Sequence, residues 1–401
     1  MTIALVVRKS LRQHALSTAI TAISIGLAGA LLMAIWVVKS QAHDTFTRVD
    51  GGFDGVLGAR SSKLQLVLNA VFHLEASPAN IEWKDYLTIT NHPGVELGVP
   101  IAMGDNYRGF RVVGTLPEMF TRTEYDPGKR YRVRVPGRLF DPTLREAVVG
   151  SYVAQKLNLQ RGDHFHPYHG LNFDEEHEHE EEYVVVGILE PSNTPADRVL
   201  WISLEGVQKM SGHAAESATQ ISAVLVKLRN PIAGQTLDMQ YNRKENRLTF
   251  AWPIGTVMAE LLGKIGWFDR LLAVVAYLVA VVAAAGILAS IYNSMNERRR
   301  QIAVLRALGA RRVFIFMSII LESVAIACIG ILIAFVIYAG LTSVATVVMR
   351  AQTGVVIDPS AFHPVMIWAP LGLIGLAALA GTVPAIKAYW VDVAEHLLPS
   401  H

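Results

Sequence analysis

The sequence predicts a membrane protein: an α-helical, four-span transmembrane domain with a large α/β domain inserted between spans 1 and 2. Of the 401 residues, 52% are hydrophobic and only 17% are charged, which is too apolar for an ordinary soluble protein. Four apolar runs reach the roughly 20 residues that a helix needs to cross a bilayer, and the segment between the first two is far more polar. The four runs are approximately residues 16–38, 271–292, 319–348 and 364–389.

The basic residues predict how these spans are oriented. Three precede the first span, six arginines lie between the second and third, and Arg350 alone lies between the third and fourth. Because cytoplasmic loops carry an excess of Lys and Arg, we expect both termini in the cytoplasm. The large domain, which has 23 basic and 28 acidic residues between positions 40 and 268, is then extracytoplasmic, on the periplasmic side of a bacterial inner membrane.

Residues 1–39 are expected to form an N-terminal amphipathic segment and the first transmembrane helix. The start of the chain is apolar and basic, as in helices that lie on a membrane surface. Ala22, Gly26 and Ala30 recur every four residues and would let another helix approach closely, although small residues are also simply frequent in membrane helices. The tripeptide SQA at 40–42 resembles a signal peptidase site. However, the apolar run exceeds the roughly 7–15 residues of a cleaved signal, so we expect a retained anchor.

Residues 40–268 have the pattern of a folded α/β domain without disulfides, because the single cysteine, Cys328, falls in the third span. Five apolar, β-branched runs predict strands. They are FRVVG at 110–114, YRVRV at 131–135, EYVVVGIL at 182–189, VLWISL at 199–204 and ISAVLVKL at 221–228.

Two stretches of this domain are predicted to be helical. Residues 144–159 have an apolar side of helical period, and residues 257–268 run almost without a break into the second span. The second stretch suggests that motions of the domain and of the membrane helix are linked. The buried side of the first would consist of Val148, Val149, Val153 and Leu157.

Residues 269–401 contain spans 2–4 and a basic amphipathic helix at about 294–310. Ile302, Leu305 and Leu308 form its apolar stripe, arginines surround them, and Gly309 is a natural helix stop. Such a helix either lies against lipid or fits a cytoplasmic partner, and physical chemistry alone leaves both open.

A histidine-rich stretch at 163–183, DHFHPYHGLNFDEEHEHEEEY, holds five of the thirteen histidines. If it forms a hairpin in which His166 faces His177, then His164 faces His179 and four rings share one side, with His169 in the turn. Imidazoles with carboxylates suit Zn²⁺ or another divalent metal such as copper or nickel. The alternative is an exposed acidic loop that collects metal incidentally. A zincin helix is excluded, because the second histidine of an HExxH motif that begins at His177 would fall at position 181, which is glutamate.

The segment NERRRQIAVLRALGA at 296–310, followed by LES at 321–323, closely resembles the permease signature of the MacB, LolC/LolE and FtsX family of ABC transporters. PAIKA at 384–388 resembles the family's C-terminal motif, although Val393 stands where proline is usual. In the external domain, GRLFD, EAVVG and LNLQRGD also resemble family sequences; they lie at 137–141, 146–150 and 157–163.

The resemblance implies a permease of the four-helix mechanotransmission type, which pairs with a second permease subunit and a cytoplasmic ABC ATPase dimer. The external domain of such proteins moves when the ATPase subunits close, and the helix at 294–310 looks like the coupling helix that docks on the ATPase. The ATPase-coupling residues would be Glu297, Arg298, Arg299, Arg300, Ile302, Leu305, Arg306, Ala307, Leu308 and Gly309.

No G-x-x-x-x-G-K-[ST] phosphate loop occurs in the sequence, so we expect no nucleotide cofactor here and no enzyme activity, with ATP hydrolysis in the partner. The cargo classes considered are a divalent metal, a lipoprotein, a peptide or a small molecule. An FtsX-like signalling scaffold that regulates an extracytoplasmic enzyme is the alternative function. The expected partners are a second copy of the chain in preference to a different permease, the lipid bilayer, and a periplasmic substrate-binding or adaptor protein. The topology excludes nucleic acid.

Overall fold

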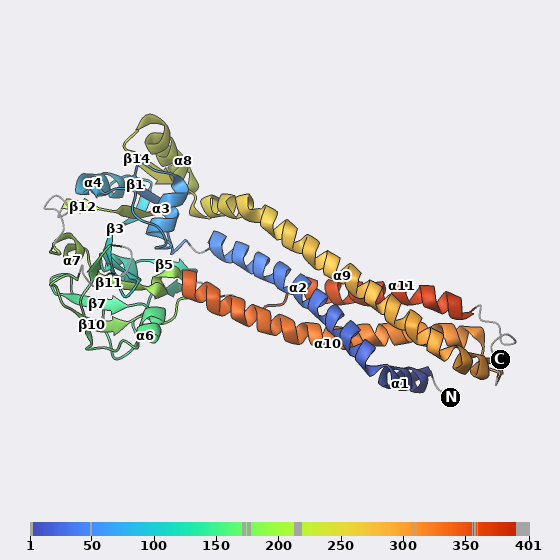
Figure 1. Cartoon of the computed structure of the whole chain (residues 1–401). Helices are drawn as coiled ribbons and strands as arrows, with labels where there is room; N and C mark the ends of the chain where they lie inside the picture. Colours follow the sequence, from blue (N-terminus) through green and yellow to red (C-terminus); the bar gives the residue numbers. More distant parts are fainter. Residues whose placement is uncertain are drawn as a thin grey trace. The chain divides into compact units, whose positions relative to one another are not determined.

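The chain divides into two compact units (Figure 1). The helical unit comprises Met1–Gln41, Ile265–Thr346 and Ile357–His401, and the α/β unit comprises Ala42–Lys264 and Val347–Val356. The computed structural model describes residues 3–48, 50–170, 174, 178–211, 219–307, 309–354, 356, 358 and 360–389. Side chains are described for these residues except 290, 293–307 and 388.

Within the described residues, four helices are long and apolar enough to cross a membrane, which confirms the four-span fold. A short helix, α1 (Ile3–Gln13), precedes them. The four are α2 (Ala15–Arg48), α9 (Ile254–Ala307), α10 (Arg312–Thr353) and α11 (Val365–Tyr389).

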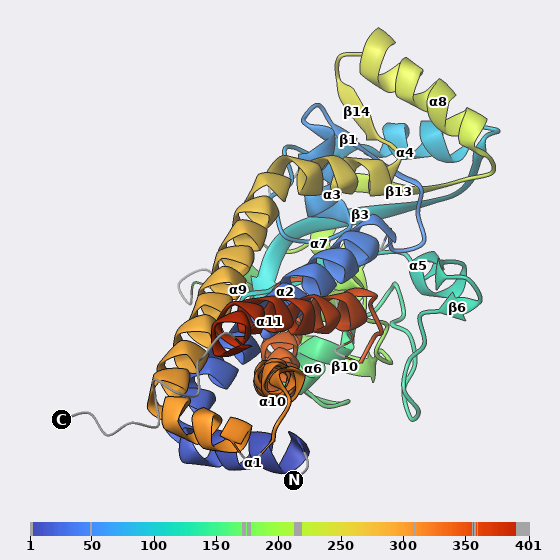
Figure 2. The same cartoon turned by 90° about the vertical axis from the view of Figure 1, so that its right-hand side faces the viewer.

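Small residues bring α2 and α10 close together in the helical unit. A Cβ atom built on Gly26 would lie 2.8 Å from Cγ2 of Ile333 and 3.1 Å from the carbonyl oxygen of Gly330, so only glycine fits there. Ala22 and Ala30 of the same predicted stripe are buried. Helices α2, α10 and α11 lie side by side in Figure 2 and share one apolar cluster with α9. Close van der Waals packing of this kind is what holds helices together in lipid.

A mixed sheet forms the centre of the α/β unit, with strand order β14-β1-β13-β3-β4-β11-β7-β10-β8 and with β9 paired to β3. The pairs β4–β11 and β7–β10 are parallel and the others antiparallel. Its strands are β1 (Gly55–Ala59), β3 (Val95–Tyr107), β4 (Phe110–Thr115), β7 (Glu146–Val149), β8 (His164–Phe165), β9 (Tyr168–His169), β10 (Tyr183–Ile188), β11 (Val199–Ser203), β13 (Ala223–Leu228) and β14 (Leu248–Ala251).

Short helices and two small ribbons complete this unit. The helices are α3 (Lys63–Ala70), α4 (Trp83–Thr90), α5 (Glu118–Thr121), α6 (Ser151–Leu157), α7 (Leu204–Gln208) and α8 (Pro231–Met239), with the 3₁₀ turn η2 (Pro195–Arg198) and the π turn η4 (Gln240–Lys244). The ribbons pair β2 (Ile81–Glu82) with β12 (Gln220–Ile221) and β5 (Glu124–Asp126) with β6 (Lys129–Arg130).

Apolar side chains cover both faces of the sheet. In β11, Leu200 and Ile202 belong to one buried cluster, whereas Val199 and Trp201 belong to the other. A strand that is buried on both faces is apolar at successive positions. For this reason the runs FRVVG, EYVVVGIL, VLWISL and ISAVLVKL were sufficient to predict β4, β10, β11 and β13.

Two local predictions were wrong. The single helix expected at 144–159 is a strand, β7, followed by α6, so that Val148 and Val149 lie in the sheet. A short apolar run is compatible with a helix and with a strand that is buried on both faces, and here residues 146–149 form a strand buried in the sheet. The strand expected at 131–135 contains only an isolated bridge between Val133 and Leu189, and its Val135-Pro136 step removes a backbone donor that a continuing ladder would need.

Candidate functional site

Helix α9 joins the sheet of the α/β unit to a membrane span without a break, as expected from the helical pattern at 257–268. Only Trp252 and Pro253 separate β14 from its first residue. Ile254, Val257 and Met258 in its first turns are buried in one of the sheet's apolar clusters. The helix has 54 residues. At 1.5 Å per residue it is about 80 Å long, whereas the hydrocarbon core of a bilayer is about 30 Å thick.

The end of α10 is also part of the α/β unit, in which residues Val347–Val356 are included. The guanidinium of Arg350 lies 5.7 Å from the ring centroid of Tyr152 in α6. Arg198, at the end of η2, donates a hydrogen bond from Nη1 to the carbonyl oxygen of Gln352. These contacts hold the last turn of a membrane-spanning helix against two elements of the α/β unit.

Gly354 ends α10 in a backbone conformation that few other residues adopt, with φ of +78°. A Cβ atom at this position would lie 2.9 Å from the carbonyl oxygen of Thr194 and 3.1 Å from Cα of Pro195. Glycine is therefore required both by the backbone and by the close approach. We call this contact the α10 seat, formed by Tyr152, Thr194, Pro195 and Arg198 on one side and by Arg350, Gln352 and Gly354 on the other.

A buried carboxylate fixes the turn on which the α10 seat rests. Asp197 accepts hydrogen bonds from the backbone amides of Ser192 and Asn193 and from the Ser192 hydroxyl, at 2.8–3.1 Å. Burial raises the pKa of Asp197, although these hydrogen bonds oppose the change. Burial also disfavours the charged form of the neighbouring Arg198 and therefore lowers its pKa. The α10 seat thus rests on an internally bonded turn instead of a loose surface loop.

The predicted ATPase-coupling segment forms the last turns of α9, which end at Ala307, and is not a separate helix. Gly309 follows with φ of +95°, the left-handed conformation expected of a helix-ending glycine. Leu308 lies outside the described residues. The coupling side chains from Glu297 to Ala307 are not described either, so their contacts remain predictions.

The histidine segment pairs in a different register from the one we expected. Tyr183 of β10 lies opposite Phe165 of β8, and His166 approaches Glu182. The expected pairing placed His166 opposite His177. The rings of Phe165 and Tyr183 stack at 5.9 Å and are both buried, so the apolar side chains determine the register. The observed pairing differs from the expected one by an odd number of residues, which changes the face on which the histidines lie.

The described histidines consequently separate into two groups, and His177 lies outside the described residues. In the exposed group, Nδ1 of His164 and Nε2 of His166 lie 3.3 and 3.9 Å from Oε1 of Glu182. In the other group, Nδ1 of His169 and Nε2 of His179 lie 3.4 and 3.0 Å from Oδ1 of Asp105. Asp105 was not among the predicted site residues; its signal was a buried acid near the end of β3, a mainly apolar strand whose other acid is Glu96.

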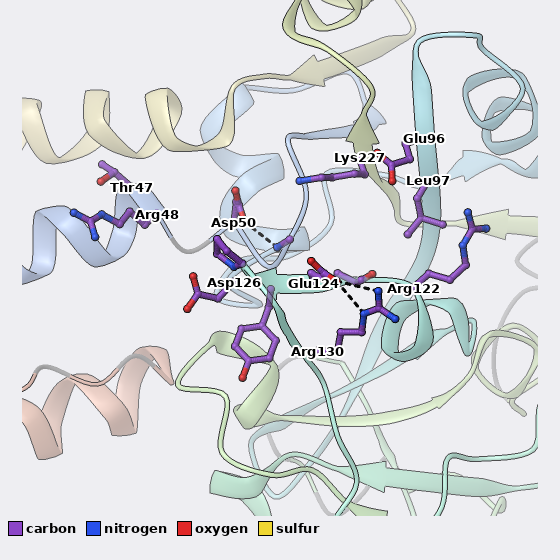
Figure 3. Close-up of a pocket in the computed structure, with 14 residues that line it drawn as sticks. Thr47, Arg48, Asp50, Glu96, Leu97, Arg122, Glu124, Asp126, Arg130 and Lys227 are labelled. Carbon is purple, nitrogen blue, oxygen red and sulfur yellow. Dashed lines mark hydrogen bonds and ion pairs between the residues drawn. The ribbon is translucent and has the colours of Figure 1, made fainter.

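A polar cavity of about 840 Å³ lies elsewhere in the α/β unit (Figure 3). Its lining has four basic and four acidic side chains, so it favours neither anionic nor cationic ligands. Nη2 of Arg130 lies 2.9 Å from Oε1 of Glu124, and the two side chains face each other in Figure 3. Burial raises the pKa of Asp50 in its wall. The charged lining residues are Arg48, Arg122, Arg130, Lys227, Asp50, Glu96, Glu124 and Asp126.

Together, the four apolar helices, the α/β domain between the first and second, and the continuous α9 define a multi-pass membrane protein with one large extramembrane domain. The family model described as "MacB-like periplasmic core domain" matches residues 16–240, more than half of the chain, and that described as "FtsX-like permease C-terminal" matches residues 273–393. The chain therefore belongs to the MacB/FtsX-like family of ABC transporter permeases, which confirms the resemblance noted in its sequence.

Two solved structures are similar to parts of the chain. The periplasmic region of MacB from Actinobacillus actinomycetemcomitans is 11% identical, with 52% of this chain and 94% of that chain covered at a TM-score of 0.35. The extracellular domain of the noncanonic ABC-type transporter YknZ from Gram-positive bacteria is 14% identical, with 49% and 98% covered at a TM-score of 0.30. Among curated protein sequences, none matches this chain.

Proposed function

We propose that this chain is the permease subunit of an ABC complex and transmits the work of a separate cytoplasmic ATPase mechanically to its extracytoplasmic domain. The observation that carries the proposal is the continuity of α9 and α10, both of which run unbroken from the helical unit into the α/β unit. Since α9 is about 50 Å longer than a bilayer core is thick, it has enough length to meet partners on both sides.

The α10 seat supports this proposal within the α/β unit. Force carried by a helix reaches a domain only if the helix end is held, and Arg198, Arg350 and Gly354 hold it by hydrogen bonding, by a cation–π contact and by close packing. At the cytoplasmic side, Ile302, Leu305 and Leu308 are proposed to enter the ATPase, with arginines around them.

The proposed assembly has two copies of the chain and two ATPase subunits in the inner membrane, with both chain termini in the cytoplasm. Helix α9 leaves Val274, Leu278 and Val281 exposed within the helical unit, as expected for a helix that faces lipid or a second subunit. A divalent metal, a lipoprotein, a peptide or a small molecule is the proposed cargo.

The experiment removes the two arginine contacts of the α10 seat. We expect Arg198→Ala with Arg350→Ala to retain the basal ATPase activity of the reconstituted complex and to lose at least tenfold of its cargo-dependent transport into or out of vesicles. Arg161→Ala, which changes an exposed arginine of the same unit, is the matched control. Full transport by the double variant would contradict mechanical coupling through the α10 seat.

The same assay distinguishes the signalling alternative. ATP hydrolysis that responds to a soluble extracytoplasmic partner, without any cargo movement across the vesicle membrane, would support a scaffold of the FtsX type. Cargo movement that depends on ATP supports a transporter.

A further inference from the structure

We infer that Asp105, His169 and His179 form a site in the α/β unit for a divalent cation of the zinc class. Each residue offers one ligand atom, and these atoms all lie within 4.8 Å of one another. The residues come from three places in the chain: the central strand β3, the short strand β9 that pairs with it, and the segment that leads into β10. The inference rests on this geometry and is independent of the proposed coupling function.

His179 has the hydrogen bonding of a metal ligand. Its Nδ1 lies 2.7 Å from the carbonyl oxygen of Ser211. Because a carbonyl oxygen only accepts, Nδ1 carries the hydrogen, and in neutral imidazole Nε2 then presents its lone pair. Nε2 lies 3.0 Å from Oδ1 of Asp105, where a protonated ring would donate a hydrogen bond and the neutral ring would place its lone pair against the carboxylate. Two electron-pair donors in such proximity are stabilised by a cation, and an imidazole whose other nitrogen is bonded to a backbone carbonyl is typical of metal sites.

A second shell holds the carbonyl that orients His179. The carboxylate of Glu181 accepts hydrogen bonds from the backbone amide and the hydroxyl of Ser211, at 2.9 and 2.8 Å. Glu181 is itself buried. The direction in which Ser211 presents its carbonyl oxygen is therefore fixed by two bonds, and the tautomer and ring orientation of His179 are fixed in turn.

The distances fit a small cation with short bonds. Zinc–nitrogen and zinc–oxygen bonds of about 2.0–2.2 Å in tetrahedral geometry place neighbouring ligand atoms roughly 3.3–3.6 Å apart. Oδ1 of Asp105 lies 3.4 Å from Nδ1 of His169 and 3.0 Å from Nε2 of His179. These two distances are within a few tenths of an ångström of that range. The two imidazole nitrogens lie within 4.8 Å of each other, so binding would also draw the exposed His169 ring toward His179. Two imidazoles and one carboxylate favour zinc, copper or nickel over magnesium or calcium.

Burial gives the cluster one closed side and one open side. The side chains of Asp105 and His179 are 0% and 5% exposed, whereas that of His169 is 52% exposed. A cation can therefore enter past His169 and be held by two ligands that cannot move away. His164, His166 and Glu182 lack this arrangement, because all three are 38–55% exposed.

The test measures Zn²⁺ binding to the full-length protein in nanodiscs, by calorimetry and by the metal content after dialysis. His169→Ala is the central variant, because an exposed side chain is lost and the fold is expected to persist. His164→Ala with His166→Ala is the matched control. The Co²⁺ form adds a second measurement, since its visible spectrum reports the ligands. We expect the control to keep the tight site, and His169→Ala to weaken it at least tenfold, to lower the stoichiometry by one and to change the Co²⁺ spectrum.

Three results would overturn the inference. The first is wild-type protein that binds Zn²⁺ only at millimolar concentrations or more weakly. The second is a His169→Ala variant with unchanged affinity and an unchanged Co²⁺ spectrum. The third is loss of the tight site in the control variant. Asp105→Asn provides an independent check: it keeps the size of the side chain but weakens its metal binding, so a tight site that survives this change also contradicts the assignment.

Discussion

Replacing Gly354 by alanine tests whether the end of α10 is held as the structure indicates. An alanine at φ of +78° costs roughly 1 kcal/mol or more in backbone conformation. In addition, its Cβ would lie 2.9 Å from the carbonyl oxygen of Thr194, so α10 or η2 must move. Overpacking of this kind typically costs about 1–3 kcal/mol.

The chain offers a matched control at Gly128, between β5 and β6. Its φ is +74°, and a Cβ there would meet no atom within 4 Å. Gly128→Ala therefore has a similar backbone cost without the steric contact. The difference between the two variants isolates the packing at the α10 seat, which we expect to be about 2 kcal/mol.

Hydrogen–deuterium exchange of the backbone amides at residues 347–354 is the assay. Each 1.4 kcal/mol corresponds to a factor of ten in an equilibrium constant, so local opening of the last turn should become roughly 30-fold more frequent in Gly354→Ala than in Gly128→Ala. Exchange at the first turns of α9 should stay unchanged in both. Equal exchange at residues 347–354 in the two variants would refute the argument that this turn is fixed by close packing.

Three further predictions follow from other parts of the chain. Charge reversal at residues 298–300 with Leu305→Asp should abolish co-purification with the ATPase, and unaltered binding would rule out the coupling assignment. Burial, with Arg111 and Arg198 nearby, lowers the pKa of His73 from 6.5 to about 3. Below pH 6.5 the unfolded chain therefore binds a proton at His73 that the folded domain excludes. As the pH is lowered from 6.5 to 3, this group should reduce the free energy of unfolding by roughly 1.4 kcal/mol per pH unit. Urea unfolding should show this slope, and His73→Gln should remove it; a slope that persists in the variant would contradict the assignment. Gly26→Leu should lower the thermal stability of the helical unit by about 3 kcal/mol or prevent folding, whereas Gly286→Leu, where a Cβ meets nothing within 4 Å, should be tolerated; similar losses in both would contradict the close crossing of α2 and α10.

Features that depend on composition over long stretches could be predicted from the sequence. The four spans follow from apolar length alone, and α9 follows from helical periodicity that continues past residue 257. Strands such as β11 and β13 are apolar at most successive positions because both faces of the sheet are covered. In these cases local residue pattern and tertiary burial agree, so the pattern suffices.

Features that depend on contacts between distant residues could not be predicted. The predicted hairpin pairs its histidines with one another. In the structure Phe165 and Tyr183 determine the register, because burying them contributes more to stability than any pairing of surface side chains. Asp105 lies about sixty residues before His169 and meets it only because β9 pairs with β3. The α10 seat joins Arg198 to Gln352 in the same way. Gly354, like Asp105, had a local signal that did not lead to a prediction, since a glycine after a helix also has an ordinary role as a terminator.

The most direct test of mechanical coupling is the distance between spin labels on the α/β units of the two copies in the proposed complex, after reconstitution. Arg161→Cys, in a background in which Cys328 is replaced by serine, places one label on each exposed domain surface. The coupling account predicts that the distance changes by several ångströms when ATP closes the ATPase dimer, and that Arg198→Ala with Arg350→Ala abolishes the change while hydrolysis continues. An unchanged distance in the wild-type complex during ATP turnover would contradict it.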